Sequence, residues 1–156
     1  MRSIAMRSIA LLLAASPVLA QGRSPDLTGT WTLDVAKSRS SQPLPLGRTL
    51  VIERAPNGYV FHQVDGTDSA TFRISLAGAG ASVNQSDGAS AVRYTAHMAA
   101  DTIIYLVDVT VDNQGLAATQ SGRLFVSNGG RMLTDLSELV AGGDPVEQQL
   151  VYDKKR

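Results

Sequence analysis

Apolar and polar residues alternate with a period of two along several stretches of the chain, and this alternation predicts β-strands. In the stretch 71–77, TFRISLA, the side chains of Phe72, Ile74 and Leu76 fall on one face and polar side chains fall on the other. The stretches 92–98 and 146–153 alternate in the same way. Period two indicates a sheet with one buried and one wet face. No stretch after residue 20 sustains an apolar helical stripe, so we expect little or no helix.

Turn signals separate the predicted strands at short intervals. Asn-Gly or Asp-Gly pairs occur at 57–58, 65–66, 87–88 and 128–129, and such pairs favour tight hairpins because both residues tolerate positive φ. We therefore predict an all-β fold, a single up-and-down antiparallel meander that closes into a barrel of roughly eight to ten strands. A β-sandwich is the alternative, but it needs long crossovers, and the irregular stretch 38–47 could supply only one.

The single tryptophan of the chain, Trp31, lies in the first predicted strand. Gly29 shares a strand face with Trp31, and the missing side chain would let a neighbouring strand or loop pass close. We interpret Gly29 and Trp31 as a structural plug at one end of the barrel. The alternative is that Trp31 contacts a ligand.

The alternation also predicts a buried core. The residues expected to point inward or to be largely buried are Leu33, Val35, Leu50, Ile52, Phe72, Ile74, Leu76, Tyr94, Tyr105, Val107, Val109, Leu124, Val126 and Leu150.

One predicted strand, 102–111, is apolar on both faces. Tyr105, Val107 and Val109 share a face with Ile103, while Ile104 makes the opposite face apolar as well. A strand that is buried on one side does not need this pattern. It indicates that one face belongs to the core and that the other lines a cavity or an interface, or is partly covered by a loop.

The first twenty residues read as a signal peptide. Arg2 and Arg7 precede the apolar run Ile9–Ala15, and cleavage is predicted between Ala20 and Gln21. The run is too short for a membrane span, which needs about 20 apolar residues, and no cysteine follows it to carry a lipid anchor. We therefore expect a cleaved leader over residues 1–20, one barrel domain over 21–156, no integral membrane segment in the mature chain, and a periplasmic or secreted location.

Charge and chemistry narrow the function classes. The chain has 14 Lys and Arg against 14 Asp and Glu, and the absence of a basic run argues against nucleic acid as a partner. Without cysteine there is no thiol chemistry, and no catalytic or phosphate-binding motif is present. The two histidines lie on separate predicted strands. We expect no enzymatic activity, no catalytic residue, no cofactor and no metal site.

Three stretches carry a family resemblance: LTGTWTLDVAKSR at 27–39, GRLFVSNGGRML at 122–133 and VYDKK at 151–155. The glycine and tryptophan on the first strand of a small meander barrel resemble the opening of the calycins, which include lipocalins, fatty-acid-binding proteins and avidins. Together the three stretches are similar to small exported bacterial lipocalin-like proteins of uncharacterised function. An avidin-like biotin site would need several tryptophans, and this chain has one.

The resemblance implies where a ligand would lie. In lipocalins an arginine from a late strand often covers the opening tryptophan, and Arg123 could do so here; alternatively, Arg123 is an outward strand residue. The candidate ligand-binding residues in the barrel interior are Trp31, Phe72, Tyr94, Tyr105 and Arg123.

Two functions from different classes follow. The first is an exported, non-enzymatic binding protein that holds a small apolar or amphipathic ligand inside the barrel. The second is a solid-core barrel that acts as an interaction, scaffold or inhibitor-type protein on an envelope protein partner.

Overall fold

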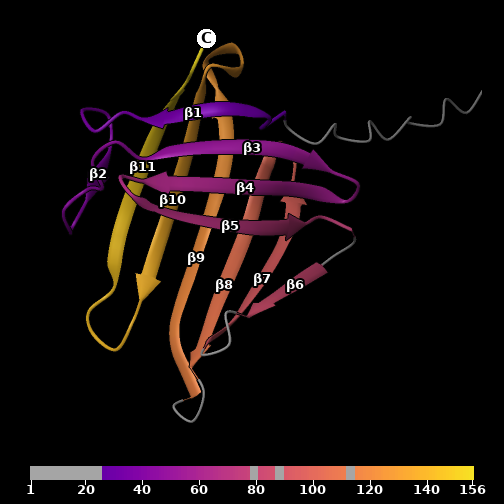
Figure 1. Ribbon diagram of the computed structural model, residues 1–156, viewed down its shortest axis with the longest axis vertical. Helices are drawn as coiled ribbons and strands as arrows, with labels where there is room; N and C mark the ends of the chain where they lie inside the picture. The colour runs from indigo at the N-terminus through magenta and orange to yellow at the C-terminus, as the bar shows by residue number, and fades with distance from the viewer. Residues whose placement is uncertain (1–25, 78–80, 87–89, 112–114) are drawn as a thin grey trace, which may run out of the picture.

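The computed structural model describes residues 26–77, 81–86, 90–111 and 115–156, with only the backbone described for 81–86 and Leu116. Strands dominate these residues, and the described part contains no α-helix, only a single 3-10 turn, η1 (Asn128–Gly130) (Figure 1). The strands are β1 (Gly29–Leu33), β2 (Arg39–Ser40), β3 (Thr49–Ala55), β4 (Gly58–Asp65), β5 (Asp68–Ser75), β6 (Ala81–Ser86), β7 (Ser90–Ala99), β8 (Thr102–Val111), β9 (Gly115–Ser127), β10 (Met132–Val140) and β11 (Val146–Lys154).

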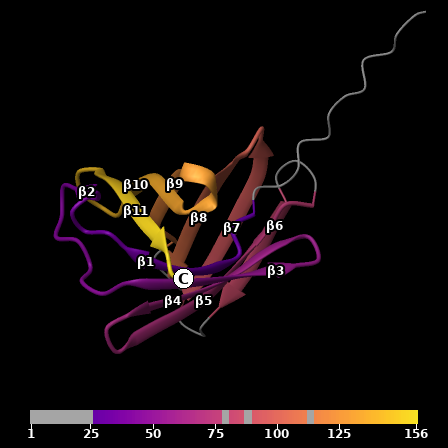
Figure 2. The ribbon, with the colours of Figure 1, turned by 90° about the horizontal axis from the view of Figure 1, so that it is seen from above.

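The strands form one continuous antiparallel path in the order β5-β4-β3-β1-β11-β10-β9-β8-β7-β6, with β2 paired to β11 beside it. In Figure 1, β1, β3, β4 and β5 run across the view, while β8 to β11 run along the long axis behind them. Figure 2 shows from above that the two sets enclose a common interior. The prediction of an all-β, up-and-down, nearly closed barrel is confirmed, and the β-sandwich alternative is not what forms.

Side chains bring together the two ends of the strand path. β5 lies against β6 and β7, although among the described residues no hydrogen-bonded ladder joins β5 to either of them. The ring of Phe72 on β5 stacks on Tyr94 of β7 with 5.4 Å between the centroids, and on Phe61 of β4 with 4.8 Å. Offset aromatic stacking at these distances is favourable. Aromatic rings therefore bridge the one side of the barrel where backbone pairing is interrupted.

The expected irregular link at 38–47 follows β1 and contains the short strand β2. Gln149 and Gln148 on β11 pair with β2, and further along β11 the partner is β1. At the change of partner, the buried hydroxyl of Ser38 accepts a hydrogen bond from the backbone N–H of Val151 at 2.9 Å. This side-chain bond holds the start of the link against the last strand.

A hydrophobic cluster lies among the strands, and Trp31 of the expected plug belongs to it. From here on, the plug means the six largest fully buried side chains of this cluster: Leu27, Trp31, Ile52, Tyr59, Ile103 and Leu133. The indole N–H of Trp31 donates to the carbonyl oxygen of Leu27 at 2.8 Å, so the buried ring leaves no polar atom unpaired. Gly29 has a φ of 128°, and a β-carbon there would lie 2.6 Å from Cε of Lys154. The missing side chain lets Lys154 of the neighbouring strand place its ammonium 5.1 Å from the centroid of the Trp31 ring.

The predicted core is largely correct, with one error. Val35 is 41% exposed, because β1 ends at Leu33 and the chain turns away from the interior. The other expected residues are buried or half-buried. Three fully buried residues were not among the expected core: Leu27, Tyr59 and Leu133. Leu27 lies before the first strand, and each of the other two is the second residue of its strand.

The predicted leader and its cleavage point between Ala20 and Gln21 lie outside the described residues, so both stay predictions. Within the residues that are described, no helix has the length and apolar character to cross a membrane.

Candidate functional site

The interior of the barrel holds a cavity of about 510 Å³. An eight-stranded barrel has room either for packed side chains or for one small ligand, and this volume corresponds to the second case. The cavity is lined by both crossing sets of strands and by the link before β3. Its lining includes Leu50, Phe61, Phe72, Ile74, Tyr94, Val107, Leu124, Leu139, Val146 and Leu150, together with the polar side chains described below. No member of the plug lines it.

A carboxyl group projects into this cavity from β10. Asp135 shares its strand face with Leu133 and Ser137, and the hydroxyl of Tyr105 on β8 donates to its Oδ1 at 2.7 Å. Tyr105 reaches β10 because Gly122 on the strand between them has no side chain. A β-carbon at Gly122 would lie 2.6 Å from the Tyr105 hydroxyl and 2.8 Å from the β-carbon of Ser137.

Neutral polar groups surround Asp135. The side-chain amide of Gln120 donates to the Tyr105 hydroxyl at 3.3 Å and to the Ser137 hydroxyl at 3.2 Å, and Ser137 also interacts with the carboxyl group. Burial raises the pKa of Asp135 to about 6, because loss of water disfavours the charged form more than these hydrogen bonds support it. Burial, followed by the nearby carboxylate, raises the pKa of Tyr105 well above its usual range.

The cavity has a second polar group, centred on Arg48. Its guanidinium donates to both carboxylate oxygens of Asp65, at 2.7 Å each, in the bidentate geometry that suits this pair. Gln63 donates to the same carboxylate at 3.0 Å, and Tyr152 interacts with Arg48 from β11. The hydrogen bond from Arg48 lowers the pKa of Asp65, so this pair is ionised at neutral pH.

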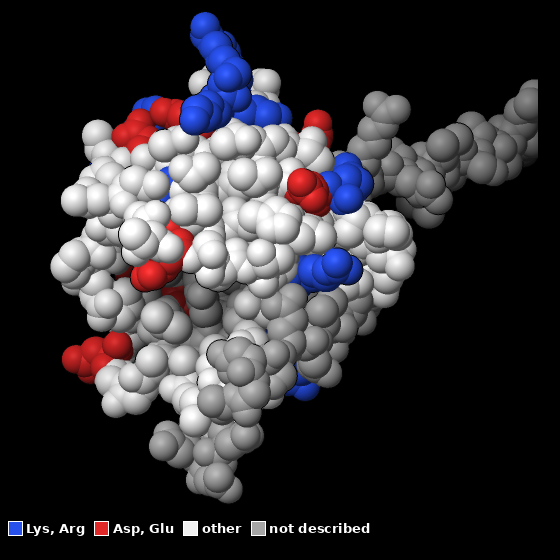
Figure 3. Space-filling model, in the orientation of Figure 1, with Lys and Arg blue, Asp and Glu red and all other residues white. Residues whose placement is uncertain are grey.

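The link between β2 and β3 covers part of the cavity. Leu44 is half-buried against the hydrophobic core, and Gln42, Pro43 and Pro45 join it in lining the cavity. Figure 3 shows the face formed by β3 to β5: it is hollowed just below β5, and acidic side chains lie beside the hollow. The cavity therefore lies beneath a surface made of β5 and of a link with little regular structure.

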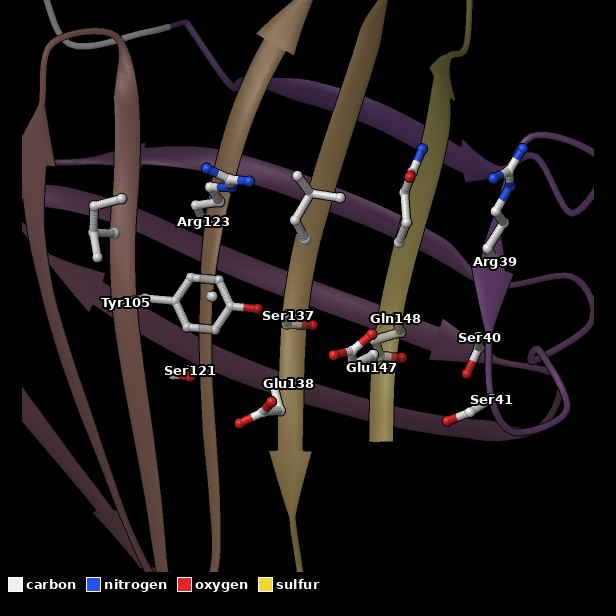
Figure 4. Close-up of a pocket in the computed structure, with 14 residues that line it drawn as sticks. Arg39, Ser40, Ser41, Tyr105, Ser121, Arg123, Ser137, Glu138, Glu147 and Gln148 are labelled. Atoms are coloured by element: carbon white, nitrogen blue, oxygen red, sulfur yellow. The ribbon is translucent and has the colours of Figure 1, made fainter. Parts of the chain in front are cut away.

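A second, wider hollow of about 860 Å³ lies on the outer face of β8 to β11, beside β2. Figure 4 shows Arg123 and Arg39 at its two sides, with Glu138 and Glu147 between them. This groove is open to solvent, and it exposes both signs of charge with few apolar side chains. The inner cavity is less open than this groove, and its lining combines mostly apolar side chains with a small number of placed polar groups, the usual character of a small-molecule site.

The structure brings together three of the five residues expected in the interior. Phe72, Tyr94 and Tyr105 line the cavity. Trp31 lies in the plug and does not line it.

The fifth residue, Arg123, does not lie in the interior, and of the two alternatives the outward position is the one observed. Its neighbour Leu124 points into the core, so the alternation of the strand turns Arg123 outward, where it is exposed and lines the outer groove. Lys154 occupies the position over the Trp31 ring that Arg123 was expected to take.

Sequence reasoning missed the two charged residues that line the cavity, Arg48 and Asp135. Both could have been recognised from the alternation of inward and outward positions along the chain. Arg48 is in phase with the predicted core residues Leu50 and Ile52, and Asp135 is in phase with Leu133. A charged residue on an otherwise apolar strand face marks a functional candidate more often than a surface charge does.

The described residues contain no group of three or more His, Asp or Glu side chains placed to hold a metal ion. Asp65, which begins a turn that a calcium ion could use, is bound instead by Arg48 and Gln63. The site as described offers apolar enclosure, hydrogen bonding and charge.

Comparisons with known proteins agree with the fold. No family model matches the chain, and no curated protein matches it in sequence. Among solved structures, the chain is similar to human cRBP IV (14% identity, TM-score 0.54, covering 83% of this chain and 98% of that one). It is similar to a secretary abundant heat soluble protein from Ramazzottius varieornatus (13% identity, TM-score 0.58, 86% and 98%). It is also similar to Caenorhabditis elegans lipid binding protein 8 (12% identity, TM-score 0.54, 82% and 94%). At these identities the likeness shows the fold alone: this chain forms a nearly closed antiparallel β-barrel similar to the barrels of these structures.

Proposed function

We propose that this protein is a non-enzymatic binding protein that holds one small apolar or amphipathic molecule inside its barrel. The cavity of about 510 Å³ carries this proposal, because it is enclosed, mostly apolar and supplied with polar side chains at fixed positions. One structural neighbour, Caenorhabditis elegans lipid binding protein 8, is named for lipid binding, and this supports the same class of ligand here.

The cavity also bears on the alternative function. A solid-core scaffold barrel would fill its interior with side chains, whereas here a cavity of about 510 Å³ remains beside the buried hydrophobic cluster. The apolar run and basic residues of the predicted leader support export, so we place the binding function in the periplasm or outside the cell.

Fluorescence titration with the neutral apolar probe N-phenylnaphthylamine tests the proposal. Val107 lines the cavity, while Ile104 on the same strand lines the outer groove. We expect saturable binding by the wild-type protein, loss of binding in Val107→Trp, and unchanged binding in the matched control Ile104→Trp.

Each variant needs a folding control, because a tryptophan can over-pack a core. A sheet-type circular dichroism spectrum and cooperative urea unfolding establish that the variant has folded, and Leu139→Trp offers a second way to fill the cavity. Absence of probe binding by the folded wild-type protein contradicts the proposal. Loss of binding in Ile104→Trp with retention in Val107→Trp places the site in the outer groove instead.

A further inference from the structure

The two charged side chains that line the cavity do not neutralise each other directly. Among the described residues that form its lining, Arg48 is the single basic side chain and Asp135 is the single acidic one. They are not paired with each other, because no ion pair joins them among those that the described residues form. The chemistry of a ligand head group therefore depends on what each of the two charges already contacts.

The charge of Arg48 is already used within the protein. Both carboxylate oxygens of Asp65 accept hydrogen bonds from its guanidinium at 2.7 Å, and the two side chains are mostly buried, with 19% and 27% of their surfaces exposed. A bidentate pair of this kind is strong and geometrically specific. A ligand carboxylate would have to compete with Asp65 for the only basic group in the lining.

The charge of Asp135 has no such partner. Its hydrogen bonds come from the hydroxyl groups of Tyr105 and Ser137, which are neutral, and Arg48 acts on it only at longer range. The surface that Asp135 retains faces the cavity, since the residue is enclosed by protein on its other sides and lines that space. An enclosed carboxylate is costly unless a cation or a strong donor approaches it.

The aromatic rings of the cavity favour the same kind of group. Phe61, Phe72 and Tyr94 stack in one series and all three line the cavity. The face of an aromatic ring attracts a cation, and because Phe72 is stacked on both of the other rings, Phe61 and Tyr94 are the rings that can present a face. Carboxylate and aromatic surface are therefore presented to the same enclosed space.

We propose that the ligand of this cavity is an apolar molecule with a positively charged amine head, placed against the carboxylate of Asp135, and that the cavity discriminates against carboxylate heads on the same chain. This inference rests on the proposed function, since it names the class of molecule bound at that same site.

Displacement of N-phenylnaphthylamine by dodecylamine, dodecanol and dodecanoate at pH 7.5 tests the head-group preference. The three compounds share one chain, and each is used below the concentration at which it forms micelles. We expect dodecylamine to displace the probe at a concentration at least tenfold lower than dodecanoate, with dodecanol between them.

Asp135→Asn tests the residue. Asparagine keeps the shape and can still accept the hydrogen bond from Tyr105, so the variant removes the charge and exchanges one acceptor oxygen for an NH2 donor. We expect the preference for amine over carboxylate to fall to within about threefold. Glu138→Gln is the matched control, because it removes an exposed acid on the outer face of the same strand and should leave the preference unchanged.

Acid provides a second readout on the wild-type protein. The charged or titratable groups that face Asp135 are Tyr105 on β8, Tyr152 on β11 and Arg48 before β3, while β9 contributes the neutral Gln120. Burial raises the pKa of both tyrosines, and neither histidine lines the cavity, so among the described residues of the lining Asp135 alone changes charge between pH 5 and 7.5. Dodecylamine should therefore bind more weakly at pH 5, and dodecanol should not.

The outcomes separate this inference from the proposed function. Equal or tighter binding of dodecanoate or dodecanol, or an amine preference that survives Asp135→Asn, overturns the amine head and leaves the cavity as a ligand site. Probe binding that none of the three compounds displaces also overturns the inference alone. Absence of probe binding overturns both.

Discussion

The plug and the Asp135 side of the cavity lie in one barrel and use many of the same strands, yet one is filled by apolar side chains and the other is a hollow lined in part by charged ones. In the plug, large apolar side chains are wholly buried, and the one indole N–H is paired at 2.8 Å. Around the cavity, Arg48 just before β3 and Asp135 on β10 lie in phase with apolar residues. Filling an interior stabilises a fold, whereas a hollow with enclosed charges destabilises it. The plug therefore maintains the barrel, and the cavity costs stability, which is what the proposed binding function requires.

The largest effect should come from emptying the plug. Trp31→Ala removes a fully buried indole and should lower the free energy of unfolding by about 3–5 kcal/mol. Urea unfolding followed by circular dichroism measures it. Trp31→Phe should cost less, because it retains most of the apolar contact and loses the hydrogen bond to Leu27. If Trp31→Ala unfolds like the wild type but no longer retains the apolar probe, Trp31 belongs to the site and the comparison fails.

Removing the enclosed charge should have the opposite sign. The pKa of Asp135 rises from 3.8 to about 6 on folding, so the folded state keeps its proton at a pH where the unfolded state releases it. Stability attributable to this group therefore falls as the pH rises from about 4 through 6. Asp135→Asn should raise the free energy of unfolding at pH 7.5 by up to roughly 3 kcal/mol.

Urea unfolding at several pH values checks this prediction. The advantage of Asp135→Asn over the wild type should shrink as the pH falls and approach zero only at about pH 3, below the unfolded pKa of 3.8, where the carboxyl group is mostly protonated in both states. A variant that is less stable than the wild type at pH 7.5 would show that the carboxylate supports the fold rather than the site.

Breaking the second polar group should destabilise by an intermediate amount. Arg48→Met leaves the Asp65 carboxylate without its bidentate donor, and a hydrogen bond to a charged group contributes about 1.5–3 kcal/mol. A double-mutant cycle with Asp65→Asn isolates the pair. Coupling close to zero would mean that Arg48 remains available to a ligand anion, which weakens the contrast between the two charges.

The smallest effects belong to the surface cations. Lys154→Ala removes the ammonium over the Trp31 ring and should cost about 0.5–1 kcal/mol. Arg123→Ala, on the outer face, should stay within about 0.5 kcal/mol of the wild type and show no coupling to Trp31. Thermal unfolding of both variants is sufficient, and a larger loss for Arg123 would contradict its outward placement.

The sequence predicts the barrel better than it predicts the site, for physical reasons. Alternation in 71–77 and Asn-Gly pairs such as 57–58 act locally, so they specify strands and hairpins without knowledge of distant contacts. The site depends on contacts that no local pattern contains. Tyr105 meets Asp135 across a strand because Gly122 leaves space, and the glycine by itself does not indicate which two residues it joins.

The choice between the two positions considered for Arg123 has the same origin. A resemblance can suggest that a cation covers Trp31, but the parity of β9 decides which way the side chain points. The strand beside β1 is β11, and it supplies Lys154 to that position instead. Register is a property of the assembled sheet, and a shift of one residue along a strand turns its inward side chains outward.

The pairing of β1 with β11 has a consequence for the order of events in folding. Trp31 lies opposite Lys154, so the ladder that joins the two halves of the barrel brings together residues from near the two ends of the described chain. Contacts this distant in sequence form late and slowly, because the intervening chain must first give up its freedom. The packing around Trp31 can therefore be completed only after residue 154 has been synthesised, and until then the ring lacks its contact with Lys154.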